Sequence, residues 1–259
     1  MKIYIPTLGR VDNQITIKSI PDNLLDKTYL VCSEKEAPLL KKIHDNLIIC
    51  PKEINGIGKV RQYIIDKSTE PYLLFLDDDL VFLKRENNSK KLKPIDKTEF
   101  TALYNWFMQK LNEGYPMVGL SARQGNHLSY PEKEIYLSRI FTVYALNTEI
   151  LKNFNVRFDE MDLMEDFNVA LRLIRYGFKT IINTEYAHSQ KNSNQKGGCS
   201  LYRNIETQSK AARLLVKKHK PFVKLVKKKT ESWEGMEERE DVMIYWKKAY
   251  NGGKYGKHN

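Results

Sequence analysis

Tyr72-Leu73-Leu74-Phe75-Leu76-Asp77-Asp78-Asp79-Leu80 joins a short apolar run directly to three consecutive carboxylates. The apolar run is typical of a buried strand in a parallel sheet. Three acids at the end of such a strand repel one another and lose hydration, so the arrangement is costly unless a cation neutralises it. Hard oxygen ligands suit Mg²⁺ or Mn²⁺, which commonly bridge one or two carboxylates to substrate phosphates. The stretch alone leaves open a helix cap or a solvated acidic turn.

Short apolar runs and helical patterns alternate on both sides of this stretch. The predicted strands are Lys2–Ile5, Tyr29–Cys32, Leu47–Cys50, Tyr72–Leu76, Met117–Ala122, Ile140–Leu146 and Lys179–Ile182. The predicted helices are Gly58–Ile65, a segment with Phe100, Leu103, Phe107 and Leu111 on one face, and Met164–Gly177. Alternation of this kind favours an α/β domain with a mainly parallel sheet flanked by helices.

Two polar stretches interrupt the second half of this pattern. Residues 123–134 form a polar loop that could wall a site, and Ala187-His188-Ser189 opens a polar stretch through Gly198 that we expect to be a mobile loop.

The composition changes after Leu201. Residues 201–230 hold ten Lys or Arg and one acid, Glu206. Pro221 is expected to separate two short basic helices. We therefore expect a catalytic domain over residues 1–190, a basic and mainly helical segment over 191–250, and a disordered tail over 251–259.

Composition limits the class of protein. The chain has 259 residues, 41% of them apolar, and a net charge of +11, which suit one large domain and a polyanionic partner such as nucleic acid or an anionic membrane surface. Cys32, Cys50 and Cys199 are too few and too scattered for a disulfide framework or a thiolate metal site. No export signal precedes the first strand, and no apolar run reaches the roughly 20 residues of a membrane span. A soluble cytoplasmic protein is expected, and the oligomeric state is left open.

Four motifs occur in a fixed order along the chain. They are Ile5-Pro6-Thr7-Leu8-Gly9-Arg10, the segment from Gly58 to Arg61, Leu76-Asp77-Asp78-Asp79, and Glu165-Asp166 at a helix start. In this order they resemble the GT-A class of nucleotide-sugar glycosyltransferases, over roughly residues 1–190. The resemblance implies a Rossmann-like GT-A fold and a UDP-sugar donor, with UDP-glucose as the default.

The resemblance also implies roles for individual residues. The loop after the first strand and the end of the second strand would hold the nucleotide, through Pro6, Thr7, Gly9, Arg10 and Ser33. The D-x-D maps onto Asp77 and Asp79 as ligands of Mn²⁺ or Mg²⁺, and His188 matches the position of a further metal ligand. The Glu165-Asp166 pair would face the acceptor.

The chemistry of glycosyl transfer explains why these residue types are needed. The departing nucleoside diphosphate gains negative charge, which a metal held by Asp77, Asp79 and His188 would stabilise. The acceptor hydroxyl must lose its proton to a carboxylate; Asp166 is the first candidate for this base and Glu165 the second. A base opposite the leaving group predicts inversion. The cationic side chains Arg10, Lys59 and Arg61 would contact the diphosphate or orient Asp77 and Asp78.

Each candidate also has an interpretation without function. Glu165 and Asp166 could be N-terminal helix charges worth about 0.3–1 kcal/mol each. His188 and Arg61 could be ordinary surface residues, and Thr7 with Gly9 could form a tight turn. The ordered occurrence of all the motifs is what favours an enzyme.

The acceptor is suggested by a narrower resemblance. The short N-terminal motif, Gly197-Gly198-Cys199-Ser200 and the Lys-rich C-terminal segment are similar to phage-associated glycosyltransferases that modify hydroxymethylated pyrimidines in DNA, grouped with TET/JBP-type pathways. This implies a phage-encoded enzyme acting in the host cytoplasm. The basic segment 201–230 independently suits double-stranded DNA, because Lys and Arg neutralise its phosphates. Three tyrosines, Tyr130, Tyr136 and Tyr144, are candidates to stack on a flipped base.

Other functions remain open at this point. A basic amphipathic helix also suits anionic lipid, as expected of a bacterial polysaccharide or lipopolysaccharide glycosyltransferase. The three aspartates could instead serve a metal-dependent nuclease or nucleotidyltransferase, or be structural in a non-catalytic DNA-binding protein.

Overall fold

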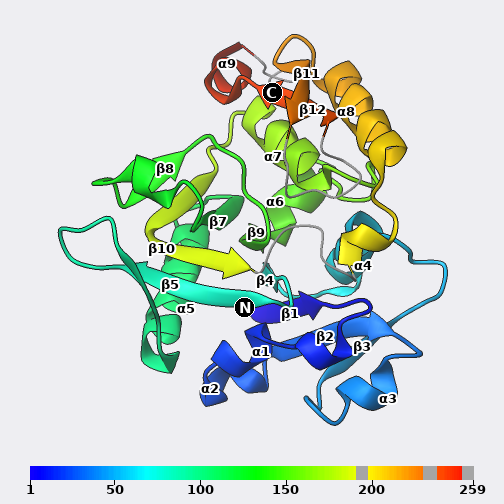
Figure 1. Ribbon diagram of the computed structural model, residues 1–259, viewed down its shortest axis with the longest axis vertical. Coiled ribbons are helices and arrows are strands. Elements are labelled where there is room, and N and C mark those ends of the chain that lie inside the picture. The colour runs from blue at the N-terminus through cyan, green and yellow to red at the C-terminus, as the bar shows by residue number, and fades with distance from the viewer. Residues whose placement is uncertain (191–197, 230–237, 253–259) are drawn as a thin grey trace.

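The computed structural model describes residues 1–190, 198–229 and 238–252, and a large sheet forms its centre (Figure 1). Its strands lie in the order β3-β2-β1-β4-β9-β7-β10-β5-β6, with β8 paired to β10. The bounds of these strands are β1 (Lys2–Pro6), β2 (Thr28–Ser33), β3 (Leu47–Cys50), β4 (Tyr72–Leu76), β5 (Leu80–Arg85), β6 (Leu92–Pro94), β7 (Met117–Ala122), β8 (Glu134–Tyr136), β9 (Val143–Asn147) and β10 (Ile181–Gln190).

Most of the strands point the same way. The four neighbours β3, β2, β1 and β4 are parallel, as are β7 and β10. Antiparallel β9 lies between β4 and β7, and β5 and β8 run antiparallel to β10. The predicted α/β class and the mainly parallel sheet are confirmed. The sequence pattern did not predict β5. This strand begins directly after the three aspartates and lies between β10 and β6, antiparallel to β10.

Helices cover both faces of this sheet. They are α1 (Thr16–Ser19), α2 (Asp22–Leu25), α3 (Ala37–Leu40), α4 (Ile57–Lys67), α5 (Lys97–Asn112), α6 (Thr148–Asn153) and α7 (Glu165–Arg175). One apolar core packs α5 and α1 to α3 against the sheet through residues such as Phe100, Phe107 and Leu40. The other packs α4, α6 and α7 through residues such as Ile64 and Val169. Alternate side chains of each strand point to opposite faces, so both faces are buried.

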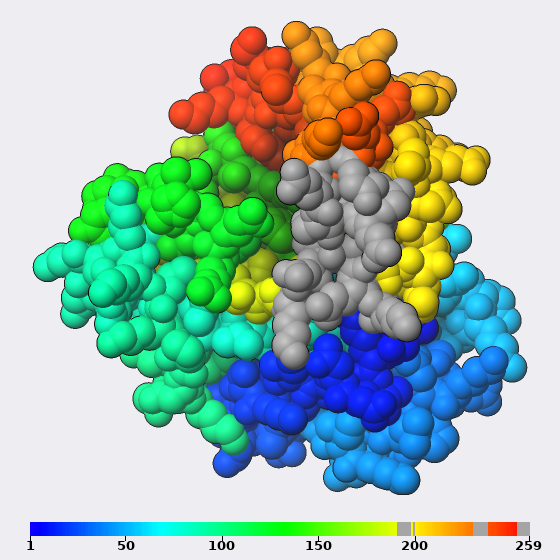
Figure 2. All heavy atoms as spheres, viewed as in Figure 1, coloured from blue at the N-terminus to red at the C-terminus, as the bar shows by residue number. Residues whose placement is uncertain are grey.

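The remaining elements form what we call the C-terminal module: α8 (Ile205–His219), the hairpin of β11 (Val223–Lys229) and β12 (Glu238–Ile244), and α9 (Trp246–Gly252). It packs on α7 through Leu171, Ile174, Ala212, Leu215 and Val223. Figure 2 shows the C-terminal module, in yellow, orange and red, gathered at the end of the molecule opposite the blue N-terminal elements. Helix α7 is therefore buried on two sides, by the sheet and by the module.

The prediction of a second basic helix after Pro221 is wrong. Residues Val223–Lys229 form strand β11 instead, paired antiparallel with β12. Here Lys228 lies 3.3 Å from Asp241, and Lys229 lies 3.4 Å from Glu238. The acids that pair these lysines lie beyond the basic segment, so its own composition did not reveal the hairpin.

The predicted boundaries around the last strand of the sheet are also corrected. Strand β10 runs through Gln190, so His188 lies within a strand rather than in a loop. It pairs with β5 on one side and β7 on the other, which supplies the backbone partners that extend the strand. Residues 191–197 of the expected loop lie outside the described residues. Asn251 and Gly252 of the expected tail end α9, and 253–259 lie outside the described residues.

Within the described ranges, no helix is long and apolar enough to cross a bilayer.

Candidate active site

Two polar loops meet where strands β1 and β4 end. Because these strands are parallel neighbours, Thr7 to Arg10 and the three aspartates emerge at the same edge of the sheet, where α/β proteins commonly bind ligands. Thr7 Oγ1 donates to Asp78 Oδ2 at 2.7 Å. One nitrogen of Arg10 donates to Asp78 Oδ1 at 2.9 Å and to Asp79 Oδ2 at 3.1 Å. The structure therefore brings the first and third predicted motifs together.

Two residues that the sequence did not single out hold this turn in place. Thr16 Oγ1 donates to the backbone oxygen of Asp77 at 2.5 Å and accepts from Leu80 N at 2.9 Å. Gln14 Nε2 donates to Thr7 Oγ1 at 2.8 Å and to the backbone oxygen of Arg10 at 2.9 Å. The Thr16 contacts join segments more than 60 residues apart in sequence, so no local pattern could have revealed them, whereas the Gln14 contacts lie within the loop after β1. They fix both loops before any ligand binds.

Arg61 connects the third motif to the fourth. Its guanidinium donates to Asp77 Oδ1 at 3.3 Å and to Glu165 Oε1 at 2.6 Å. Arg61 is only 5% exposed, and its guanidinium carbon lies 5.2 Å from the ring centroid of Tyr144. It is thus a buried bridge and not a surface helix residue. Removing one partner of a buried ion pair typically costs about 3–5 kcal/mol, because the other charge is left uncompensated.

The start of α7 is drawn close to α4 by a glycine. A Cβ at Gly58 would lie 2.7 Å from the backbone oxygen of Phe158 and 2.9 Å from that of Met161. Met164 adopts a φ of 60° immediately before the helix. This turn sets Glu165 and Asp166 on the first turn of α7, where both are buried.

Arg139 holds Asp166, and the sequence reasoning missed it. Its Nε and one terminal nitrogen each lie 3.1 Å from Asp166 Oδ2. The guanidinium carbon lies 4.4 Å from the ring centroid of Phe141 and 4.1 Å from that of Phe167. An arginine held between two rings and bonded to a carboxylate has few rotamers left, so Asp166 is fixed in orientation. Glu165 is held by a different arginine, Arg61.

The crowded carboxylates resist ionisation. Burial raises the pKa of Asp77 to about 7 against the opposing charge of Arg61, although a third of the Asp77 side chain stays exposed. Burial also raises the pKa of Asp78 and Asp79, with Arg10 opposing the shift at both. The pKa of Glu165 is raised by burial as well. A bound cation at this edge would favour the ionised carboxylates.

Some buried polar atoms at this edge suit a metal ion. Among the described residues, Asp79 Oδ1 and both ring nitrogens of His188 are buried without a hydrogen-bond partner. Burial, together with the charge of Arg139, lowers the pKa of His188 to about 4, so the imidazole is neutral at pH 7 and able to ligate. Its ring meets that of Phe141 edge-on at 5.3 Å between centroids. The carboxylate oxygen fits Mn²⁺ or Mg²⁺, and the neutral imidazole offers a nitrogen ligand.

The predicted metal ligands do not form one cluster. In the part of the chain that the structure describes, no three His, Cys, Asp or Glu side chains are grouped to hold a metal ion. Asp77 turns toward Arg61, and Asp79 turns toward Arg10, so their carboxylates are directed to different partners. A cation here would need ligands from a bound diphosphate, which is the usual arrangement for Mg²⁺.

The other predicted nucleotide contacts have different positions. Ser33 ends β2 and donates to Glu36 Oε2 at 2.6 Å, while Glu36 Oε1 accepts from Gly9 N at 2.6 Å. Pro6 is the last residue of β1. The structure thus joins the ends of both strands through Glu36. Lys59 is exposed on α4, and no ion pair joins it to another described residue.

The prediction that Tyr144 could stack on a flipped base is wrong. Tyr144 is fully buried, with its ring 5.7 Å from Phe75 and 5.9 Å from Phe158 between centroids. It cannot reach a nucleic-acid base because the sheet and α4 enclose it. Tyr136 is exposed and Tyr130 is partly exposed, so both stay predictions.

The segment that enters the C-terminal module crosses the same edge. Gly198 N donates to the backbone oxygen of Leu8 at 2.7 Å, and Ile57 N donates to Tyr202 Oη at 3.2 Å. Residues 198–202 therefore contact both the loop after β1 and the start of α4. The motif residue Gly197 lies outside the described residues, as does the side chain of Cys199.

The sequence matches the model of a known protein family. Residues 1–198 match the model of the TET-Associated Glycosyltransferase family.

Curated proteins of two kinds resemble the chain. The processive diacylglycerol beta-glycosyltransferase of Mycoplasma genitalium is 27% identical over 72% of this chain, which spans 59% of that enzyme's length. The beta-glucosyl-HMC-alpha-glucosyl-transferases of Enterobacteria phages T2 and T6 are 23% and 21% identical over 73% and 90% of this chain, and over 69% and 85% of their own lengths. The two kinds differ in the acceptor that their names indicate.

Solved structures share the fold. S. aureus TarS 1-349 in complex with UDP-GlcNAc superposes with a TM-score of 0.54 at 15% identity, over 83% of this chain and 66% of that one. Glucosyl-3-phosphoglycerate synthase from Mycobacterium tuberculosis, in complex with Mn²⁺, UDP-glucose and phosphoglyceric acid, superposes with a TM-score of 0.50 at 14% identity, over 87% and 83%. The sheet and its flanking helices are those of GT-A glycosyltransferases, as the sequence motifs predicted.

Proposed function

Because this chain belongs to the TET-associated glycosyltransferase family, we propose that it moves a sugar, by default glucose from UDP-glucose, onto the hydroxyl of a hydroxymethylated pyrimidine in DNA. The family makes the protein a glycosyltransferase, so the nuclease, nucleotidyltransferase and non-catalytic interpretations are set aside. The phage T2 and T6 relatives, named for transfer to glucosylated HMC, support the DNA acceptor. They also support a phage-encoded enzyme that works in the host cytoplasm.

The proposal for donor binding rests on the edge of the sheet where Asp77, Asp78 and Asp79 emerge. Asp79 offers a buried, unpartnered oxygen, His188 a neutral imidazole, and Asp77 a third donor on the other side of the turn. These residues would hold Mn²⁺ or Mg²⁺ together with the diphosphate, and the metal would supply charge stabilisation for the departing nucleoside diphosphate. Arg10 keeps Asp78 and Asp79 in place and adds positive charge beside the diphosphate. Solved relatives of this fold hold UDP or UDP-glucose with such metals.

Asp166 is the proposed base. Its Oδ2 is engaged by Arg139, which leaves Oδ1 to accept the proton of the acceptor hydroxyl. Glu165 is less suited, because it is held more closely, at 2.6 Å, by an arginine that is itself buried, whereas the side chain of Arg139 is 43% exposed. Asp166 would take the proton of the acceptor hydroxyl while the hydroxyl oxygen attacks the anomeric carbon from the side opposite the departing nucleoside diphosphate, so the proposed outcome is inversion at that carbon.

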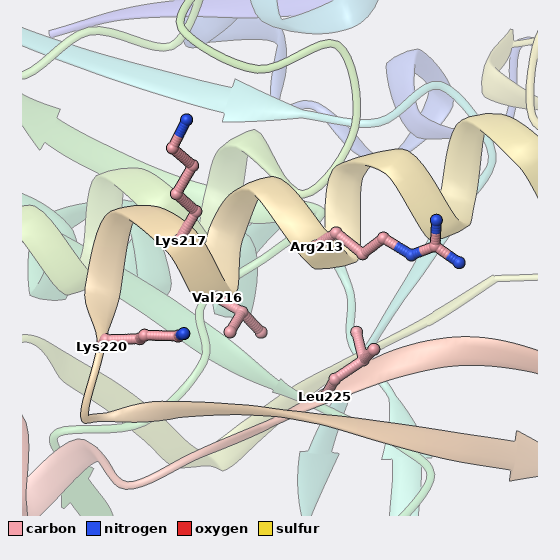
Figure 3. Close-up of a pocket in the computed structure, with 5 residues that line it drawn as sticks. All are labelled: Arg213, Val216, Lys217, Lys220 and Leu225. Atoms are coloured by element: carbon pink, nitrogen blue, oxygen red, sulfur yellow. The ribbon is translucent and has the colours of Figure 1, made fainter.

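A cationic stripe on α8 supports contact with DNA. Lys210, Arg213 and Lys217 recur at spacings of three and four, so they share one exposed side of the helix, and exposed Lys220 follows directly after the helix ends. Arg213, Lys217 and Lys220 line an open pocket of about 200 Å³ together with Val216 and with Leu225 of β11 (Figure 3). Arg213 is bonded to Glu240 at 2.8 Å, whereas Lys217 and Lys220 are exposed. Over the roughly 10 Å from Lys210 to Lys217, such a stripe can follow several phosphates of one strand.

The direct test is mass spectrometry of nucleosides from DNA. Duplexes that contain 5-hydroxymethylcytosine are incubated with the protein, Mn²⁺ and a set of nucleotide sugars, beside unmodified duplexes. We expect the mass of one hexose on the modified base alone, with UDP-glucose as the donor. A transfer to diacylglycerol vesicles in the same donor mixture, with DNA unchanged, would instead favour the lipid acceptor that the mycoplasma relative suggests.

The cationic stripe leads to a separate prediction about the affinity of the protein for DNA. Replacing Lys217 and Lys220 together by Ala should weaken DNA binding and reduce the slope of log K against log salt by about 1.8, since each phosphate contact contributes about 0.9. The measurement is fluorescence anisotropy with labelled duplex at several salt concentrations. A double variant of Lys35 and Lys42, which are exposed near α3, removes the same charge elsewhere. If both double variants gave the same slope of log K against log salt, the cationic stripe would not be part of the surface that binds DNA.

A further inference from the structure

The loop between β7 and β8, residues 123–133, presents one apolar side chain to solvent. Leu128 is 80% exposed, the largest fraction among the exposed large apolar side chains of the described residues. A single exposed leucine is common on protein surfaces and by itself indicates nothing. What distinguishes Leu128 is the way in which its loop is built.

The loop is anchored from below by Asn126, which is 2% exposed. Asn126 Nδ2 donates to Ser121 Oγ at 2.5 Å and to the backbone oxygen of Thr184 at 2.9 Å. Leu128 N donates to the backbone oxygen of Gly125, which has a φ of 85°. A left-handed glycine followed by this bond defines one compact turn with Leu128 at its tip.

A buried arginine from β5 holds the same loop from the side. Arg85, 7% exposed, donates to the backbone oxygens of Asn126 at 3.2 Å and of Glu132 at 2.9 Å, and to Asn126 Oδ1 at 3.0 Å. It also donates to Ser129 Oγ at 3.2 Å, and its guanidinium carbon lies 5.5 Å from the Tyr130 ring centroid. Burying a guanidinium to bind a loop backbone fixes that loop. The exposed Leu128 is therefore presented on a rigid support.

The loop begins beside the candidate active site. Arg123 N donates to the backbone oxygen of His188 at 2.8 Å. The His188 ring contacts Phe141, and Phe141 packs on Arg139, which binds Asp166. Continuous contacts thus join the base of the loop to the proposed catalytic carboxylate. Exposed Arg123 and His127 flank the turn and suit a phosphate backbone.

The proposed base is recessed. Asp166 is only 6% exposed, on the first turn of α7. A hydroxymethyl group on a base that stays stacked in a duplex projects only a short way into the major groove, so it cannot readily enter such a site. Extruding the nucleotide brings the hydroxyl within reach, at a free-energy cost of unstacking.

We propose that Leu128 is the wedge that enters the base stack beside the target nucleotide and fills the space left when that nucleotide is extruded toward Asp166. Apolar side chains on DNA-binding proteins act in this way between base steps. The proposal rests on the DNA acceptor proposed above, and it assigns the β7–β8 loop a role in opening the duplex.

The test compares Leu128→Ala with the wild type on three acceptors that contain 5-hydroxymethylcytosine. These are a matched duplex, a duplex with the modified base opposite an abasic site, and a single strand. We expect kcat/KM on the matched duplex to fall about tenfold or more, because the space of the extruded base is no longer filled. On the two acceptors whose target base is already unpaired, the variant should stay within about twofold of the wild type. Leu39→Ala, at a 50% exposed leucine of α3, is the matched control and should match the wild type on all three.

A second measurement reports unstacking without turnover. A 2-aminopurine next to the target base should brighten when wild-type protein binds the matched duplex, and less so with Leu128→Ala. Equal rates of both proteins on the matched duplex, or an equal loss on all three acceptors, would overturn the wedge. If the wild type transfers sugar to none of the three, the proposed function fails first.

Discussion

Replacing Asp79 by Ala is expected to lower kcat/KM by at least about three orders of magnitude and to abolish metal-dependent donor binding. Removal of the charge stabilisation that a metal gives a leaving group amounts to several kcal/mol, and each 1.36 kcal/mol is about tenfold in rate. Asp79 is chosen because its Oδ1 is buried without a partner, whereas both oxygens of Asp78 are bonded to Thr7 or Arg10.

The measurement is calorimetric titration of UDP-glucose in the presence of Mn²⁺ or of EDTA. Wild-type protein should bind the donor much more tightly with the metal, and Asp79→Ala should show the same weak binding in both. Asp12→Ala, at an exposed aspartate beside the same loop, is the matched control and should bind as the wild type does. Metal-dependent binding that survives in Asp79→Ala would assign the metal to other residues.

Asp166→Asn is expected to reduce kcat by about 10²- to 10⁴-fold while leaving donor affinity within about twofold, as for loss of a general base. The amide keeps the shape of the side chain and can still contact Arg139, but it cannot take a proton. Single-turnover rates with saturating donor and modified DNA separate this chemical step from binding.

Two comparisons make this prediction specific. Asp162→Asn changes an exposed acid just before α7 and should leave kcat unchanged. Glu165→Gln removes the charge that pairs with Arg61, so it should lower the melting temperature more than Asp166→Asn does. A normal kcat in Asp166→Asn, or an equal loss of donor affinity in Asp166→Asn and Asp79→Ala, would contradict the separate roles.

The sequence was sufficient for the central architecture because the relevant signals are local. An apolar run of five residues before Asp77 is typical of a short buried strand, and the first strand ends before Thr7 by the same logic. In a parallel sheet, strands end at a common edge, so the predicted fold already implied that the two loops could meet. Acids in the first turn and Gly177 at the end likewise marked α7.

Where prediction failed, the deciding partner lay far along the chain. The lysines of β11 were expected in a helix because their acidic partners on β12 come nine or more residues later. Strand β10 runs past His188 because β5 and β7 both pair with it, and neither is its neighbour in sequence. Tyr144 was predicted to be accessible to a base, but the sheet and α4 enclose it in the structure.

The sequence by itself determined the kinds of group at the site: three acids after a strand, a threonine and an arginine after its neighbour, and two acids at a helix start. Only the tertiary structure decided what each group does. It turns Asp77 and Glu165 toward Arg61, leaves one oxygen of Asp79 unpartnered, and clamps Asp166 with Arg139. These contacts span long stretches of chain. They depend on which strands become neighbours, and local propensity carries no information about that.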